Sequence, residues 1–157
     1  MRKILLILLV LSAITMANDV KIYKGTSSSY SDVIVNVQDG KIYKKTSSSY
    51  SDILLNVKGD RIYKGTSSSY SDVVATIRDG KVYKGTSSSY SDILLNIKDG
   101  RIYKGTSSSY SDVVANIQSG KVYKGTSSSY SDVSFRYDGL LTLEEFIAVW
   151  FAVKYIW

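Results

Sequence analysis

The chain of 157 residues contains no cysteine, no histidine and no proline. Without cysteine it has neither disulfides nor a thiol nucleophile, and without histidine it lacks the commonest general base. The same two absences remove most ligands of transition metals. These absences predict a protein that is not an enzyme and that has no catalytic residues, no cofactor and no metal site.

The first 17 residues have the pattern of a secretory signal peptide. Arg2 and Lys3 precede an apolar run over residues 4–14, and small residues lie near Ala17. The apolar run is shorter than the ~20 residues that span a bilayer, although an uncleaved anchor is the alternative. We expect cleavage near Ala17 and a periplasmic or secreted protein. Although the net charge is +6, export and the interleaved aspartates argue against a nucleic-acid partner.

One decapeptide, YKGTSSSYSD, begins at residue 23 and returns unchanged at 63, 83, 103 and 123, with one substitution (Lys45) in the copy at 43. The full period is 20 residues without insertion, from residue 21 to residue 140. Repetition at this period indicates a modular architecture in which each unit is one supersecondary element. We therefore expect a six-repeat β domain over residues 18–139.

Each repeat contains two segments typical of strands, at 21–25 and 32–37 in the first repeat. Positions 33, 35 and 37 and their equivalents are apolar in every repeat, which predicts a strand with one buried face. Asp-Gly or a similar pair joins the second segment to the first segment of the next repeat and predicts a tight hairpin. The Ser-rich segment joins the two strands within a repeat. Because Lys45 replaces a glycine there, that position is not expected always to need a glycine.

Because each hairpin spans the boundary between two repeats, one strand without a hairpin partner is left at each end of the repeats, at 21–25 and at 133–137. If these two strands pair, twelve strands close into a barrel-like ring without edges. The alternative is an open β-hairpin solenoid whose end is capped by the C-terminal segment. In a closed ring all Ser-rich loops surround one mouth and all Asp-Gly turns surround the other.

Residues 140–157 break the repeat and predict a buried helix that belongs to the same domain. Thr142 and Glu145 have the spacing of a capping box, and from there to the end the only further charge is Lys154. An apolar helix over residues 143–157 would be buried on all sides as the core of the ring. A helix lying in a membrane interface is the alternative. The structural residues predicted for this helix are Thr142, Glu145, Phe146, Trp150, Phe151 and Trp157.

The segment YDGLLTLEEF (137–146) resembles the second half of an EF-hand calcium loop. Asp138, Gly139, Thr142 and Glu145 match the family, but Arg136 stands where a carboxylate ligand belongs. A hairpin turn followed by a helix cap explains the same residues, and no calcium site is expected.

The repeat block as a whole resembles uncharacterised exported bacterial proteins built from tandem repeats of the YKGTSSSYSD type. That resemblance implies export and a non-enzymatic role. The 20-residue hairpin unit is also similar to choline-binding repeats. Their paired tryptophans and aromatic cage are absent here, so choline binding is not implied.

The repeated loops are the candidate binding sites, because tyrosine rings stack on sugars while Ser, Asp and Lys bind hydroxyl groups. Six weak copies would add avidity for a polymeric ligand. The partner expected is therefore an envelope polymer or surface glycan, and the alternatives are a purely structural or self-assembling protein or one anchored at a membrane by its helix. The candidate loop residues are Tyr30, Asp32, Tyr50, Asp52, Tyr70, Asp72, Tyr90, Asp92, Tyr110, Asp112, Tyr130 and Asp132.

Overall fold

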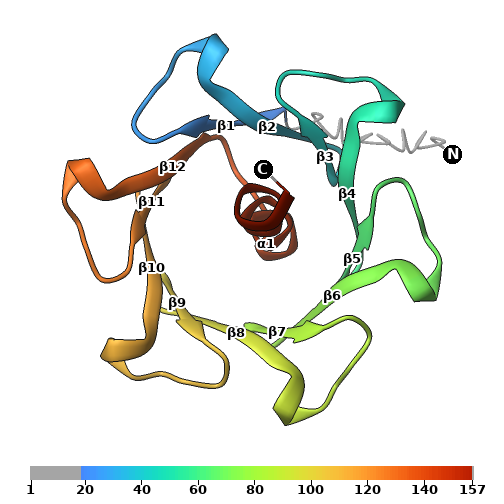
Figure 1. The fold of residues 1–157 in the computed structure, drawn as a ribbon, viewed down its shortest axis with the longest axis vertical. Coiled ribbons are helices and arrows are strands. Elements are labelled where there is room, and N and C mark those ends of the chain that lie inside the picture. Colours follow the sequence, from blue (N-terminus) through green and yellow to red (C-terminus); the bar gives the residue numbers. More distant parts are fainter. Residues whose placement is uncertain (1–18, 157) are drawn as a thin grey trace, which may run out of the picture.

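The computed structural model describes residues 19–156 and forms a closed antiparallel barrel of twelve strands around a C-terminal helix (Figure 1). The predicted signal peptide and Trp157 lie outside the described residues. The first strands of the six repeats are β1 (Val20–Lys24), β3 (Lys41–Lys44), β5 (Arg61–Lys64), β7 (Lys81–Lys84), β9 (Arg101–Lys104) and β11 (Lys121–Lys124). The second strands are β2 (Val33–Gln38), β4 (Ile53–Lys58), β6 (Val73–Arg78), β8 (Ile93–Lys98), β10 (Val113–Gln118) and β12 (Val133–Asp138). A 3-10 turn precedes each second strand: η1 (Tyr30–Asp32), η2 (Tyr50–Asp52), η3 (Tyr70–Asp72), η4 (Tyr90–Asp92), η5 (Tyr110–Asp112) and η6 (Tyr130–Asp132).

The ring closes through the two strands that the repeat phase leaves over. β1 pairs with β12 in antiparallel register, with Ile22 opposite Tyr137 and Lys24 opposite Phe135, and its other edge pairs with β2. Every strand thus has two neighbours and no edge remains for pairing with another chain. The closed barrel is confirmed, and the open solenoid is not what this sequence forms.

Hairpin turns between repeats use the left-handed backbone that the Asp-Gly pairs predict. Asp39 and Gly40 have φ of +49° and +71°, as a type I′ turn requires. The carbonyl oxygen of Gly40 also accepts a hydrogen bond of 2.7 Å from the backbone nitrogen of Val57 in the next hairpin. Each turn is therefore part of the joint between neighbouring repeats as well as the link between two strands.

A β-bulge in each second strand changes which side chains face the core. In the first repeat Tyr23 pairs with Val33 while Ile22 pairs with Val35, so Ile34 is the extra residue. Paired residues share a face of the sheet, so Val33 lies with Tyr23 on the outer face, whereas Ile34 and Val35 join the central cluster. The expectation that positions 33, 35 and 37 share one buried face is wrong for position 33, because the bulge interrupts the alternation.

The position occupied by Lys45 needs positive φ in every repeat. Lys45 has φ of +52°, close to the +53° to +57° of the five glycines at the equivalent positions. The position thus accepts a residue other than glycine, as expected, but only with the glycine-like positive φ, which strains Lys45.

The C-terminal helix begins as its capping box predicts and buries its apolar residues inside the barrel. Thr142 Oγ1 accepts from the backbone nitrogen of Glu145 at 3.2 Å, and Glu145 Oε2 accepts from that of Thr142 at 2.9 Å. The α-helix α1 spans Leu143–Phe151, and a π-helical segment, η7 (Ala152–Ile156), follows. A regular α-helix to residue 157 was expected; instead the helix becomes π-helical at the buried Ala152, and within this segment Lys154 and Tyr155 are exposed. Within residues 19–156, no helix has the length and apolar character needed to cross a bilayer.

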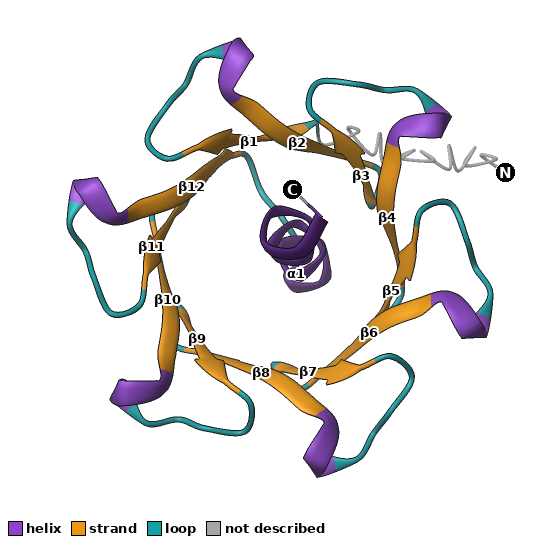
Figure 2. Cartoon of the chain, in the orientation of Figure 1, coloured by secondary structure: helices purple, strands orange, loops and turns teal. Residues whose placement is uncertain are grey.

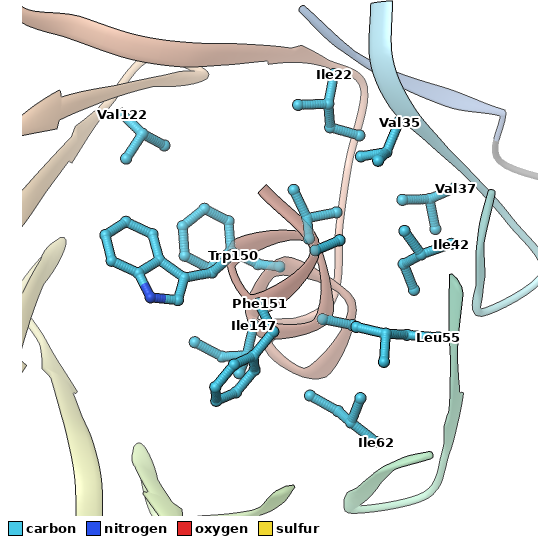
Figure 3. Close-up of a cluster of buried hydrophobic side chains, with 14 of the residues drawn as sticks. Ile22, Val35, Val37, Ile42, Leu55, Ile62, Val122, Ile147, Trp150 and Phe151 are labelled. Carbon is cyan, nitrogen blue, oxygen red and sulfur yellow. The ribbon is translucent and has the colours of Figure 1, made fainter. Parts of the chain in front are cut away.

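Helix α1 lies off the middle of the barrel and packs mainly against β2, β3, β4 and β5 (Figure 2). Ile147 is fully buried, and Leu55 and Ile62 surround the helix on this side (Figure 3). Trp150 extends toward the side of Val122, and its ring centroid is 6.4 Å from that of Phe135. The core is therefore dense on one side of the helix, and the opposite wall has less to pack against.

Candidate binding face at the loop end of the barrel

Each Ser-rich loop is held in shape by its own side chains. In the first repeat the Ser27 hydroxyl donates to Asp32 Oδ2 at 2.6 Å, and the backbone nitrogen of Ser29 donates to Ser27 Oγ at 3.0 Å. The same two bonds recur in the other five loops. The aspartates predicted as ligand contacts are therefore engaged inside the loops, with Oδ2 already accepting a hydrogen bond.

A polar side chain of the preceding repeat fixes each loop against the outer face of the barrel. Asn36 Nδ2 donates to the carbonyl oxygens of Lys45 and Ser47, at 2.8 and 2.9 Å. Asn56 makes the same two bonds to the loop that follows it, while Thr76, Asn96 and Asn116 each donate one hydrogen bond to a carbonyl oxygen of the following loop. Because side chain and loop come from different repeats, loop position depends on the integrity of the ring.

The two tyrosines of each repeat have different environments. Tyr23 is buried, whereas Tyr30 and its equivalents are 64–71% exposed. The exposed rings sit on loops that project away from the barrel axis, so the six do not converge over the mouth (Figure 2). Two of them are covered on one face by an arginine, with Arg61 Cζ 5.4 Å from the Tyr70 ring centroid and Arg101 Cζ 5.7 Å from that of Tyr110.

A ring of lysines at the last position of the first strands surrounds the mouth on the loop side. These rim lysines are Lys24, Lys44, Lys64, Lys84, Lys104 and Lys124. Lys24 pairs with Phe135 and Lys44 pairs with Val35, both of which face the core, so the rim lysines stand on the inner face of the barrel. All six are exposed because the barrel ends there.

No carboxylate within residues 19–156 lies at ion-pair distance from a rim lysine. An outward-facing lysine offers a contrast: Lys21 binds Asp19 at 2.7 Å, and this hydrogen bond raises the pKa of the Lys21 ammonium. Six equal charges around one opening create a positive potential that attracts anions. The loop end is therefore a cationic face.

Behind the rim lysines the barrel contains an open cavity of about 930 Å³. It lies between the second half of the helix and the wall formed by β6, β8 and β10. Its lining residues are Leu55, Lys64, Val74, Leu94, Leu95, Lys104, Val114, Trp150, Phe151, Lys154 and Tyr155. Lys154 lines the cavity together with Lys64 and Lys104, and its Nζ is 5.1 Å from the Trp150 ring centroid, so the helix adds a seventh cation at this mouth.

Sequence reasoning identified the loops but did not group the rim lysines with the cavity. The signal was available in the strand period, because Lys24 follows the buried Ile22 by two residues and must share its face. The cavity carries no comparable signal, since it depends on where the helix rests within the ring.

The segment that resembled a calcium loop has a structural role. Arg136 Nη2 pairs with Asp138 Oδ1 at 3.2 Å, and Glu145 caps the helix together with Thr142. Gly139 makes the turn into the helix with φ of +127°, and a Cβ there would lie 2.8 Å from Val20 Cγ2. The turn-and-cap interpretation accounts for each of these residues.

Comparison with family models matches residues 12–150 to the 6-fold beta flower protein family. Neither the curated proteins nor the solved structures gave a match. The match spans most of the chain, and the six loops around a closed ring agree with its description (Figure 1). The chain therefore belongs to the 6-fold beta flower protein family.

Proposed function

We propose that this protein is an exported, non-enzymatic binding module that holds anionic polymers or glycans of the cell envelope at the loop end of its barrel. The observation that carries the proposal is the ring of rim lysines, six exposed ammonium groups without a carboxylate partner among the described residues. A protein gains nothing in stability from crowding like charges at one opening, so a ligand of opposite charge is the natural counterpart.

Sixfold repetition favours a polymer over a single small anion. Each rim lysine and its neighbouring loop present the same groups at regular intervals, so a chain with repeated charges can occupy several positions at once. Linked weak contacts raise the overall affinity by increasing the effective concentration at the remaining sites. The exposed tyrosines, such as Tyr30, lie on loops that project outward around the barrel and offer stacking faces for sugar rings (Figure 2).

The loops themselves support binding rather than catalysis. The Ser27 hydroxyl donates to the Asp32 carboxylate, an arrangement that orients the loop but has no base to remove the serine proton. With no histidine or cysteine anywhere in the sequence, the usual means of activating that serine are missing.

The test measures affinity for dextran sulfate, with neutral dextran as the matched uncharged polymer, at low and at physiological salt. Two triple variants remove the same charge from different faces. The rim variant carries Lys24→Gln, Lys64→Gln and Lys104→Gln. The control variant carries Lys41→Gln, Lys81→Gln and Lys121→Gln on the outer face.

We expect wild type to bind dextran sulfate in a salt-sensitive manner and to ignore dextran. The rim variant should lose at least tenfold in affinity, whereas the control variant should stay within about twofold of wild type. Equal losses in both variants would show that net charge alone drives binding and would overturn the proposal, as would an absence of binding by wild type.

A further inference from the structure

Polymer binding at the rim does not involve the cavity between the helix and the far wall of the barrel, which is formed by β6, β8 and β10. Its depth is lined by aliphatic and aromatic side chains, and its mouth is lined by lysines. We propose that this cavity is a binding site for a single-chain anionic amphiphile, such as a fatty acid. The hydrocarbon chain would lie along β6, β8 and β10, and the carboxylate would face Lys64, Lys104 and Lys154.

A comparison of equivalent positions in different repeats shows that the helix does not fully cover the far wall. Ile34, Leu94 and Val114 occupy the same bulge position in repeats one, four and five. Ile34 is only 7% exposed, whereas Leu94 and Val114 are each 37% exposed and line the cavity. The difference follows from the helix, which packs against the side of the ring that includes β2. Apolar side chains thus face an opening that the protein's own described core does not fill.

The size of the cavity suits a small ligand. Pockets for small molecules commonly measure roughly 300–1,000 Å³ and combine apolar walls with a few polar groups that fix orientation. Here the apolar groups are Trp150, Phe151 and the aliphatic residues of the far wall. The described residues thus supply both parts of such a site.

The positive charge at the cavity mouth determines which class of amphiphile the cavity can bind. The three polar side chains at the mouth apart from Tyr155 are Lys64, Lys104 and Lys154, and no acidic residue within 19–156 lines the cavity. A cationic amphiphile would be repelled, and a neutral one would leave the ammonium groups without a partner. A carboxylate gains charge-assisted hydrogen bonds from these lysines.

The test is calorimetric titration of the whole protein with octanoate, decanoate and laurate, and with decanol as the neutral ligand of matched chain length. If the chain is buried in the cavity, affinity should rise about fourfold for each added methylene. Decanoate should bind at least tenfold more tightly than decanol. Affinity that does not depend on chain length, or equal affinity for decanol, would overturn the proposal.

Two variants address the cavity without changing the lysines. Val114→Trp fills the space and should reduce decanoate affinity at least tenfold, while Leu140→Trp places the same bulk at a residue that is 80% exposed and should change it little. Leu94→Asn is the second test in case Val114→Trp proves unstable, because it makes the cavity wall more polar without adding volume. Full decanoate affinity in a folded Leu94→Asn variant would contradict the assignment.

These outcomes separate the cavity from the polymer-binding proposal. Val114→Trp should retain its affinity for dextran sulfate, because the rim lysines are unchanged. Conversely, if wild type binds decanoate but not dextran sulfate, the cavity assignment stands and the polymer proposal fails. If decanoate does not bind, the cavity assignment is wrong. A sedimentation coefficient of a dimer for the protein without ligand would then show that the apolar wall serves contact between copies.

Discussion

Arg136 Nη1 donates to the backbone carbonyl oxygen of Ser27 at 3.3 Å, across a separation of 109 residues in the sequence. This contact does for the last and first repeats what Asn36 and its equivalents do for adjacent repeats. Its guanidinium also lies 5.1 Å from the ring centroid of Tyr23 in β1. One side chain in the last repeat therefore supports both the loop and the strand at which the ring closes.

Replacing this arginine should weaken the closure selectively. Arg136→Ala removes the hydrogen bond to Ser27 and the pair with Asp138, and should lower the free energy of unfolding by about 1–2 kcal/mol. Arg136→Asn, which restores the residue found in four of the other repeats, should recover part of the loss. Urea denaturation measures both variants, and an unchanged midpoint for Arg136→Ala would contradict this role.

Removing the helix should remove the core. A chain without residues 140–157 lacks every buried residue of α1 and should lose cooperative thermal unfolding. Ile147→Ala is the milder test and should cost about 2–5 kcal/mol, because Ile147 is fully buried. Leu140→Ala, at a mostly exposed residue before the helix, should change stability far less. A truncated chain with an unchanged melting temperature would show that the helix is dispensable.

Lys45→Gly should stabilise the protein. Lys45 holds φ of +52°, which costs a residue with a Cβ about 1 kcal/mol more than glycine, so the substitution should raise the free energy of unfolding by about that amount. Gly65→Lys, the reverse change in the next repeat, should lower it similarly. If Lys45→Gly proves neutral or destabilising in chemical denaturation, the lysine side chain contributes more than the strain costs.

Two glycines of the hairpin turns should respond differently to alanine. A Cβ at Gly80 would lie 2.7 Å from the carbonyl oxygen of Ile97, whereas nothing lies within 4 Å of one at Gly59. Both glycines have positive φ, so Gly59→Ala should cost about 1 kcal/mol from backbone strain. Gly80→Ala should cost about 2–3 kcal/mol, because the backbone joint between repeats must also shift. Similar melting temperatures for the two variants would contradict the tight joint.

Export is tested by expressing the whole chain in a bacterium and fractionating the cells. We expect the protein outside the cytoplasm, with an intact mass that lacks residues 1–17. A full-length mass would favour the uncleaved anchor instead.

The sequence predicts the topology of the barrel more completely than it predicts the binding surfaces. Asp39–Gly40 and the alternation in β2 identify the hairpins, and the unpaired segments at 21–25 and 133–137 predict the closure. The capping pair Thr142 and Glu145 locates the start of the helix. The turn and cap signals are local, and the closure follows from counting the strands of the repeats, so none of these predictions needs knowledge of side-chain contacts between repeats.

What the sequence did not reveal depends on contacts between repeats. The bulge at Ile34 is invisible in the apolar pattern, because positions 33, 34 and 35 are all apolar in the first repeat. The role of Asn36 requires knowing that the next loop folds back over the outer face. The cavity depends on the helix packing against β2–β5, and six nearly identical repeats do not indicate in the sequence which side of the ring the helix contacts.

Closure of the barrel also limits how the number of repeats can change in evolution. Near-identical units in tandem invite duplication or loss of a copy, and an open solenoid absorbs such events by growing or shrinking at modest cost. A seventh unit would widen the barrel, so that the helix could contact less of its wall. A barrel of five units would be narrower and would leave the helix too little room. The number of repeats is thus coupled to the single segment that is not repeated, because the width of the barrel decides how much of its wall the helix can contact.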